Sequence, residues 1–113
     1  MADLLASLAP GSRLLVVAVE RCTAEQLRAW AAAVVPGVLI GVGTPAGVRA
    51  ARAALKELEH VLFTPGSRDE IPWQEAYFTH VFDASPDSGG AAETSPELLR
   101  VLAAGGGIYS VER

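Results

Sequence analysis

The apolar residues of this chain fall into short continuous runs, and this feature restricts the possible folds more than any other. LLVVAV at residues 14–19 and VLIGV at residues 38–42 lack the alternation of apolar and polar residues that a half-exposed strand shows. The stretches that follow each run repeat apolar residues at helical spacing instead. Buried strands that alternate with helices are typical of a parallel sheet covered on both faces. The sequence therefore predicts a doubly wound α/β fold, a three-layer sandwich.

Two helices are predicted from their start signals as well as from their spacing. Thr23 and Gln26 form a capping box at the start of residues 23–35, whose apolar residues recur at positions i, i+3, i+4 and i+7. After the second apolar run, Thr44 is expected to cap a helix that Pro45 begins. Two complete strand-helix units result.

The rest of the chain supplies shorter elements. An acidic segment, DASPDSGGAAETSPE, reads as a flexible loop before a short helix that Thr94 or Ser95 caps and that the glycines at 105–107 end. A five-stranded, mostly parallel sheet in a single domain, residues 1–113, is the predicted architecture. The further predicted elements are a helix at 3–9, strands at 60–63 and 79–84, a helix at 96–103 and a strand at 108–112.

Composition excludes several classes of protein. Apolar residues make up 50% of the chain and charged residues 19%, so it can form a core. A net charge of −4 argues against a protein that binds the phosphate backbone of nucleic acids. The longest apolar run, residues 29–35, has 7 residues, far short of a membrane span. The single cysteine and the absence of a signal-like N-terminus predict a cytoplasmic protein.

Isolated reactive side chains do not form a recognisable catalytic set. Cys22 lies beside Arg21 at a helix start, where a thiol pKa is often lowered, but a packing role at this corner is the simpler interpretation. His60 and His80 are expected to be structural or exposed. These three residues are widely separated, so no metal site is predicted.

Two other groups of side chains each allow two interpretations. The aromatic residues Trp73, Tyr77 and Phe78 either line a pocket for a planar ligand or, as we prefer for Trp73 and Phe78, anchor a loop in the core. The charged residues of one loop, Arg68, Asp69 and Glu70, pair either with one another or with a partner. Those of the other loop, Asp83, Asp87 and Glu93, either act on a substrate or remain solvated.

Several stretches together resemble a known family. IPWQEAYFTHVFDAS followed by SPELLRVLAAGGGIYSVE is similar to the region of class I S-adenosylmethionine-dependent methyltransferases that reads LPF-x-D-x-x-FD-x-V and then L-x-E-x-x-R-V-L-x-PGG-x-L. Upstream, PGSRLLVVAV resembles the first strand of that family, and VLIGVGTPAGVRAARA its second strand and the helix after it. The resemblance covers about residues 8 to 113. It implies the strand order 3-2-1-4-5, with a ligand cleft where the order reverses.

The cofactor-binding positions of the family are where this sequence departs from it. Ala18, Glu20 and Cys22 stand where the family has three glycines near the methionine end of the cofactor. Gly43 replaces the acid that takes the ribose hydroxyls, and Ser67 replaces the acid that contacts adenine. A side chain at Glu20 adds bulk and like charge beside a cofactor carboxylate.

Two smaller departures lie further along the chain. Asp69 can substitute for the adenine acid if its loop shifts, and Phe78-Thr79 stands where the family has Phe-Asp in strand 4. The family also continues past strand 5 with a helix and two more strands, so we expect the last strand of this chain to be an open edge. A second copy of the chain or another protein is the simplest cover for such an edge.

These departures lead to our first hypothesis, a methyltransferase-like domain without cofactor or catalytic residues that acts through protein association. The alternative is a minimal S-adenosylmethionine-dependent methyltransferase with an atypical site, completed across a dimer. A weaker third reading is a phosphate site at the GVGTPAG turn. If cofactor binds, the residues expected to line its pocket are Val19, Glu20, Gly43, Thr44, Ser67 and Ala84.

Overall fold

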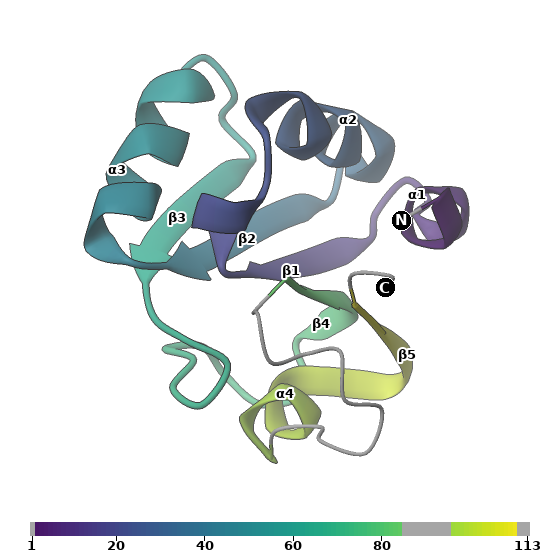
Figure 1. Ribbon diagram of the computed structural model, residues 1–113. Coiled ribbons are helices and arrows are strands. Elements are labelled where there is room, and N and C mark those ends of the chain that lie inside the picture. Colours follow the sequence, from purple (N-terminus) through teal and green to yellow (C-terminus); the bar gives the residue numbers. More distant parts are fainter. Residues whose placement is uncertain (1, 85–95, 111–113) are drawn as a thin grey trace.

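A computed structural model describes residues 2–84 and 96–110 of the chain, and its centre is a parallel five-stranded sheet (Figure 1). The strand order is β3-β2-β1-β4-β5, and each neighbouring pair runs parallel. The predicted order and fold class are confirmed. The strands are β1 (Arg13–Val17), β2 (Val38–Gly43), β3 (Val61–Pro65), β4 (Phe78–Asp83) and β5 (Leu102–Ser110).

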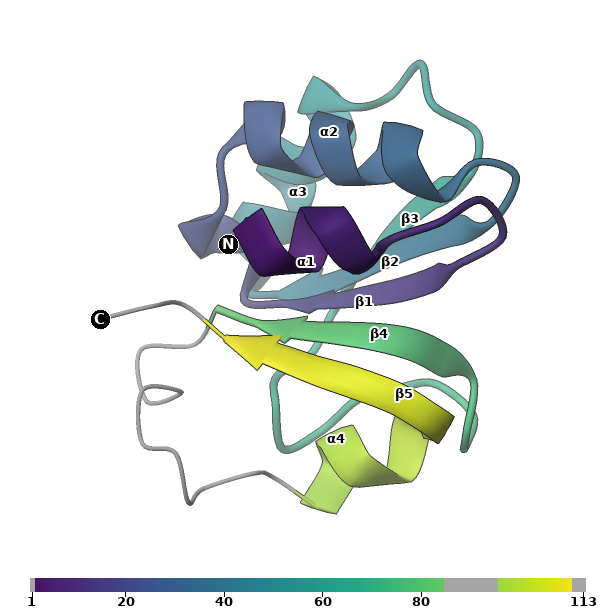
Figure 2. The ribbon, with the colours of Figure 1, turned by 90° about the vertical axis from the view of Figure 1, so that its right-hand side faces the viewer.

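Helices cover both faces of the sheet, which gives the predicted three layers (Figure 2). Three of them lie over one face and one lies on the other. Over the described residues, no helix has the length and apolar character that crossing a bilayer requires. The helices of the first face are α1 (Ala2–Ser7), α2 (Ala24–Val34) and α3 (Pro45–Ala54), and α4 (Pro96–Val101) covers the second.

The connection from β1 to α2 shows both a confirmed prediction and a correction. Thr23 caps α2, and its side-chain oxygen accepts the Gln26 N–H at 3.0 Å while Gln26 Oε1 accepts the Thr23 N–H at 2.9 Å. The predicted first strand, residues 14–19, ends early because Ala18 takes a left-handed conformation with φ 67° and ψ 58°. A short 3-10 turn, η1 (Val19–Arg21), follows it.

The start of α3 is as predicted. Thr44 is its N-cap, with Oγ1 accepting the Gly47 N–H at 3.1 Å, and Pro45 is the first helical residue. Pro suits this position because the first helical N–H has no partner within the helix.

The C-terminal elements differ from the prediction. The helix expected at 96–103 ends at Val101, and β5 begins at once, so the glycines at 105–107 lie inside the strand. Their backbone freedom allows this, because Gly105 has φ 83° and the register with β4 shifts between Phe78 and His80. The end of the predicted strand, residues 111–112, and the expected cap at 94–95 lie outside the described residues.

The predicted N-terminal helix, residues 3–9, is observed as α1. Its sequence predicts that Leu4, Leu5 and Leu8 lie on one side, which is wrong for Leu5. Leu4 is fully buried and Leu8 packs against the core, but Leu5 is 44% exposed. Leu5 follows Leu4 directly, and neighbouring helical residues point about 100° apart, so they do not share a face.

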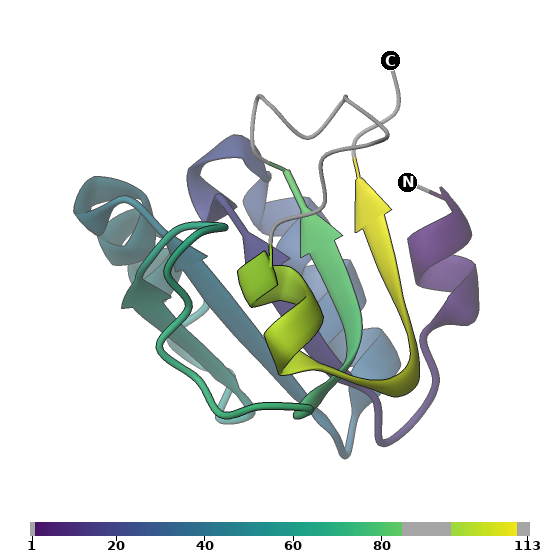
Figure 3. The same cartoon turned by 90° about the horizontal axis from the view of Figure 1, so that it is seen from below.

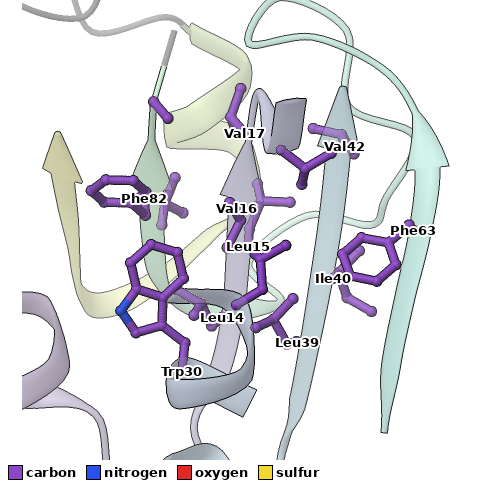
Figure 4. Packing of buried hydrophobic residues seen from close by; sticks show 14 of the residues in the cluster. Leu14, Leu15, Val16, Val17, Trp30, Leu39, Ile40, Val42, Phe63 and Phe82 are labelled. Carbon is purple, nitrogen blue, oxygen red and sulfur yellow. The ribbon is translucent and has the colours of Figure 1, made fainter. Parts of the chain in front are cut away.

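Apolar side chains of β1, β2, β3 and β4 pack together with Trp30 of α2 in the core (Figure 4). Trp30 of α2 packs on Phe82 of β4 with ring centroids 5.0 Å apart. Gly41 of β2 has to be glycine, because a Cβ there would lie 2.5 Å from the Phe63 ring and 2.6 Å from Val19. The lack of a side chain at Gly41 therefore lets η1, β2 and β3 pack closely together.

Candidate functional site

A cleft of about 290 Å³ opens at the carboxyl ends of β1, β2 and β3. Ligands of open α/β sheets bind outside the carboxyl ends of the strands where the order reverses, here between β1 and β4, and this cleft lies on the β2 side of that point. Four of the residues predicted to bind cofactor line it. The lining residues are Val17, Ala18, Glu20, Gly43, Thr44, Pro45, Pro65, Gly66 and Ser67.

The other two predicted residues do not line this cleft. Val19 is 2% exposed in η1 and lines a separate groove between α2 and α3. Ala84 is also 2% exposed, and its N–H donates to the Val17 carbonyl at 3.0 Å. Both are positioned by packing, and neither offers a polar side-chain group to a ligand.

Glu20 places its carboxylate at the end of β2. Its Oε1 accepts the Thr44 N–H at 3.1 Å, and a Cβ on Gly43 would lie only 2.3 Å from that oxygen. The carboxylate of Glu20 therefore lies where a side chain at Gly43 would begin. Sequence reasoning placed Glu20 beside the cofactor carboxylate and Gly43 beside the ribose, and only the fold of η1 brings the two residues into contact.

The same carboxylate occupies the N-terminus of α3. A helix N-terminus attracts anions because its first N–H groups lack partners and its dipole is positive there. Here Glu20 supplies the negative charge, and Thr44 takes the Gly47 N–H. The position that a phosphate would take under the third reading of the sequence is held by the chain itself.

Ala18 keeps the backbone shape of the turn without the glycine that would suit it. A left-handed conformation costs a residue with a Cβ about 1–2 kcal/mol. The turn is nonetheless held, because the Ala18 N–H donates to the Val42 carbonyl at 2.8 Å and the side chain is 7% exposed. The turn after β1 thus combines a left-handed residue with side chains, those of Ala18 and Glu20, that line the cleft.

A buried ion pair lies at the end of β4, where the strand order reverses. Arg68 Nε lies 2.9 Å from Asp83 Oδ2, and the Asp83 side chain is 2% exposed. Sequence reasoning expected Asp83 in a solvated or substrate-facing loop, which is wrong because Asp83 is buried. It expected Arg68 to pair with its neighbours or with a partner, and it missed the pair with Asp83. The reason is that the segment after β3 folds under the sheet and carries Arg68 to β4. Asp87 and Glu93 lie outside the described residues.

The segment that carries Arg68, residues 66–77, crosses the second face of the sheet without forming a helix; we call it the crossing segment (Figure 3). The helix α4 holds its middle. Glu97 Oε2 accepts the Ile71 N–H at 2.9 Å and Arg100 Nη2 donates to the Ile71 carbonyl at 2.8 Å. Ile71 itself is 3% exposed. One residue of the segment thus has both backbone groups bound by α4.

The surroundings of Cys22 disfavour the thiolate. Burial, and then the negative charge of Glu20, raise the pKa of its thiol to about 12. The thiol is therefore protonated at neutral pH. The packing interpretation is supported, since Cys22 lies half-buried against the core.

Both histidines make structural contacts. His60 Nε2 lies 2.7 Å from the Ala31 carbonyl, and His80 Nδ1 lies 2.8 Å from Thr79 Oγ1. His80 also stacks on Tyr109, with centroids 6.2 Å apart. Among the described residues, no group of three or more His, Cys, Asp or Glu could hold a metal ion.

The aromatic residues of the crossing segment pack on one another. Phe78 is fully buried, Trp73 lies 6.1 Å from it between centroids, and Tyr77 meets it edge to face at 5.0 Å. The Arg13 guanidinium lies over the Tyr77 ring at 5.2 Å. The anchoring role predicted for Trp73 and Phe78 is supported.

The cleft is a poor fit for a whole nucleoside cofactor. Pockets for ligands of that size usually hold about 300–1,000 Å³. At about 290 Å³ this cleft is at the lower limit of that range, and the space beside Gly43 contains the Glu20 carboxylate. We therefore derive no chemical step through a bound cofactor.

Solved structures of methyltransferases share this fold. Geranyl diphosphate C-methyltransferase from Streptomyces coelicolor, in complex with Mg²⁺, geranyl diphosphate and S-adenosyl-L-homocysteine, is 17% identical with a TM-score of 0.76 over 96% of this chain and 41% of its own. The complex between the Haloferax volcanii Trm112 methyltransferase activator and a putative methyltransferase is 22% identical, with a TM-score of 0.75 over 96% of this chain and 49% of its own. A methyltransferase from Aquifex aeolicus is 19% identical, with a TM-score of 0.71 over 90% of this chain and 57% of its own.

This likeness establishes the fold. The chain has the Rossmann-like fold of S-adenosylmethionine-dependent methyltransferases and spans 41% to 57% of the length of these structures. No protein-family model matches the sequence, and neither does any curated protein.

Proposed function

We propose that this chain is a methyltransferase-like domain that has lost cofactor binding and catalysis and works through association with another protein chain. The observation that carries the proposal is the Glu20 carboxylate, hydrogen-bonded to the Thr44 N–H and lying against Gly43. A cofactor that entered the cleft would have to displace this side chain and break its contact with the N-terminus of α3.

The end of β4 supports the same reading. Asp83 is a buried carboxylate at the position where the strand order reverses, and it is bound to Arg68 from the crossing segment. Breaking a buried ion pair costs several kcal/mol. In this proposal the pair has a structural role and holds the crossing segment against β4.

The two edges of the sheet indicate where association takes place. At β3, Arg52 donates two hydrogen bonds to the Phe63 carbonyl, at 2.8 and 3.2 Å, and the strand ends in Pro65, which has no N–H. Such features protect an edge from pairing. At β5 the strand is uncharged, has nine residues and pairs only with β4 among the described strands.

We therefore propose β5 as the association edge. Two copies related by a two-fold axis can pair their β5 strands antiparallel, because a strand aligned against itself matches donors with acceptors. A different protein that adds a strand would use the same groups. As part of the same proposal, the domain works in the cytoplasm, which its single cysteine supports.

One observation favours the alternative, a minimal methyltransferase with an atypical site. The Glu20 carboxylate lies at the carboxyl end of β2, where the family has the acid that takes the ribose hydroxyls. In that reading Glu20 would bind the ribose in place of the residue at Gly43.

Titration calorimetry with S-adenosylhomocysteine separates the two readings. The first predicts no heat with the folded wild type, whereas the alternative predicts micromolar binding that Glu20→Ala abolishes and Glu25→Ala, an exposed acid on α2, leaves intact. If Glu20→Ala alone gains binding, the side chain blocks a site that still exists. Wild-type binding would overturn our proposal.

Sedimentation tests the edge separately. The wild type should form dimers or larger species, and Ala104→Lys, which places a charge on exposed β5, should shift them to monomer. The matched control is Ala32→Lys on the exposed face of α2. A monomeric wild type at high micromolar concentration would remove the homodimer from the proposal.

A further inference from the structure

A second surface lies on the opposite side of the molecule, between α3 and the edge of β3. A groove of about 480 Å³ runs there, with an apolar floor and a basic rim. Its lining residues are Arg52, Leu55, Lys56, Leu58, Val61, Leu62, Phe63 and Thr64.

The apolar residues that line the groove differ in how exposed they are. Leu55 and Phe63 are buried at 1% and 3%, while Leu62 is 46% exposed. Leu58 and Val61 lie between them, partly buried against the core. Leu62 and Phe63 are neighbours in β3, so their side chains point to opposite faces of the strand, and Leu62 is the exposed apolar residue of the groove lining. An exposed leucine beside a concavity offers a partner an apolar contact.

The rim has a charge opposite to that of the protein. The chain carries a net charge of −4, yet residues 45–56 contain three basic residues and no acid. Arg49 and Arg52 share one face of α3 at i and i+3, Lys56 lies in the turn just after the helix, and all three are exposed. Of the two acids that follow, Glu57 is paired with Arg28. Basic side chains beside a groove of an acidic protein attract an acidic partner and disfavour a second copy of the chain.

The mode of binding follows from Arg52. Two of its N–H groups point at the Phe63 carbonyl, so the β3 edge is closed to an added strand at that residue, and Pro65 offers no donor. An arginine has five N–H donors, so others are left to face a carboxylate. A partner therefore docks through side chains in the groove and not by extending the sheet.

We propose that this groove docks an acidic amphipathic helix of a partner protein. An apolar side chain of the helix fills the groove beside Leu62, and acidic side chains on either flank face Arg52 and Lys56. Helices that lie in grooves bind through such apolar anchors. The proposal is independent of the β5 edge and holds whether or not the domain binds a cofactor.

Selection from a displayed library of random dodecapeptides tests the proposal. The expected binders carry a leucine, isoleucine or phenylalanine with Asp or Glu one helical turn away, and they lose affinity as salt rises. Their affinity should fall about tenfold or more in Leu62→Ser, which removes an anchor contact, and also in Lys56→Glu, which reverses the rim charge.

Matched controls keep the result specific to the groove. Leu99→Ser changes a 57% exposed leucine on α4, and Arg21→Glu reverses an exposed charge on η1. Both should bind the selected peptides as the wild type does, and thermal melts check that all four variants fold. The proposal is overturned if no peptide is enriched, if the binders lack acidic residues, or if both groove variants bind normally. It is also overturned if Leu62→Ser abolishes self-association, which would assign the groove to a second copy.

Discussion

The two halves of the sheet are built in different ways. On the β1-β2-β3 side, α2 and α3 have 11 and 10 residues, each begins at a threonine cap, and their apolar faces pack directly on the strands. On the β4-β5 side, α4 has 6 residues, no helix joins β3 to β4, and β5 contains a register shift. Regular elements support the first half, and specific polar contacts hold the second.

This difference shows where the structure is vulnerable. In the first half the ion pair between Arg28 and Glu57 is exposed, with side chains at 47% and 51%. In the second half the pair between Arg68 and Asp83 is buried. Exposed ion pairs contribute little to the free energy of unfolding, whereas breaking a buried ion pair lowers it by several kcal/mol. The second half should therefore depend much more on single charged residues.

The largest expected effect comes from Arg68→Ala. The substitution leaves the 2% exposed Asp83 without this partner, so we expect the free energy of unfolding to fall by about 3 kcal/mol. Arg28→Ala, the matched change in the first half, should cost less than about 1 kcal/mol. Urea denaturation of both variants measures the contrast, and equal losses would show that the two halves do not differ in this way.

The same contrast decides how much of the fold could be predicted. The capping box at Thr23, the Thr44 cap and the strand order all follow from local patterns and from the family resemblance. The prediction failed at β5, where a run of glycines reads as a helix stop. Glycine allows both a stop and a bulged strand, and the choice depends on pairing with β4, which no local pattern contains.

The site was predicted only in part for a related reason. Glu20, Gly43, Thr44 and Ser67 were assigned to one cleft from the resemblance, and the structure brings them together there. The contact between Glu20 and Gly43 and the ion pair of Arg68 with Asp83 were both missed. Each joins residues about 15 to 23 positions apart through the path of an irregular turn or crossing, which sequence spacing does not reveal.

A smaller effect of the opposite sign is expected at the turn after β1. Ala18→Gly removes the strain of a left-handed residue with a Cβ, while it adds entropy to the unfolded chain. The net result should be a gain of up to about 1 kcal/mol in the free energy of unfolding. Thermal melts at several urea concentrations measure it. A loss of stability would mean that the buried methyl group contributes more than its backbone costs.

The smallest expected effect is a pH dependence of the free energy of unfolding. It comes from the hydrogen bonds that Glu97 and Arg100 make with the backbone of Ile71, which we call the Ile71 clamp. The hydrogen bond from Arg100, and next the one from the Ile71 N–H, lower the pKa of the Glu97 carboxyl to about 2. The folded pKa is thus below the unfolded value near 4.5, so this contribution is complete above that value and is lost as pH falls toward 2.

The clamp is solvated, so its contribution is small and is best seen as a difference between proteins. The urea midpoint of the wild type should fall between about pH 4.5 and 2 more steeply than that of Glu97→Gln, which keeps the shape of the side chain without the titrating carboxyl. Glu25→Gln, on the first turn of α2, serves as the control in the regular half and should follow the wild type. Parallel curves for the wild type and Glu97→Gln would show that the charge of Glu97 does not hold the crossing segment, and that the buried Ile71 side chain keeps it in place.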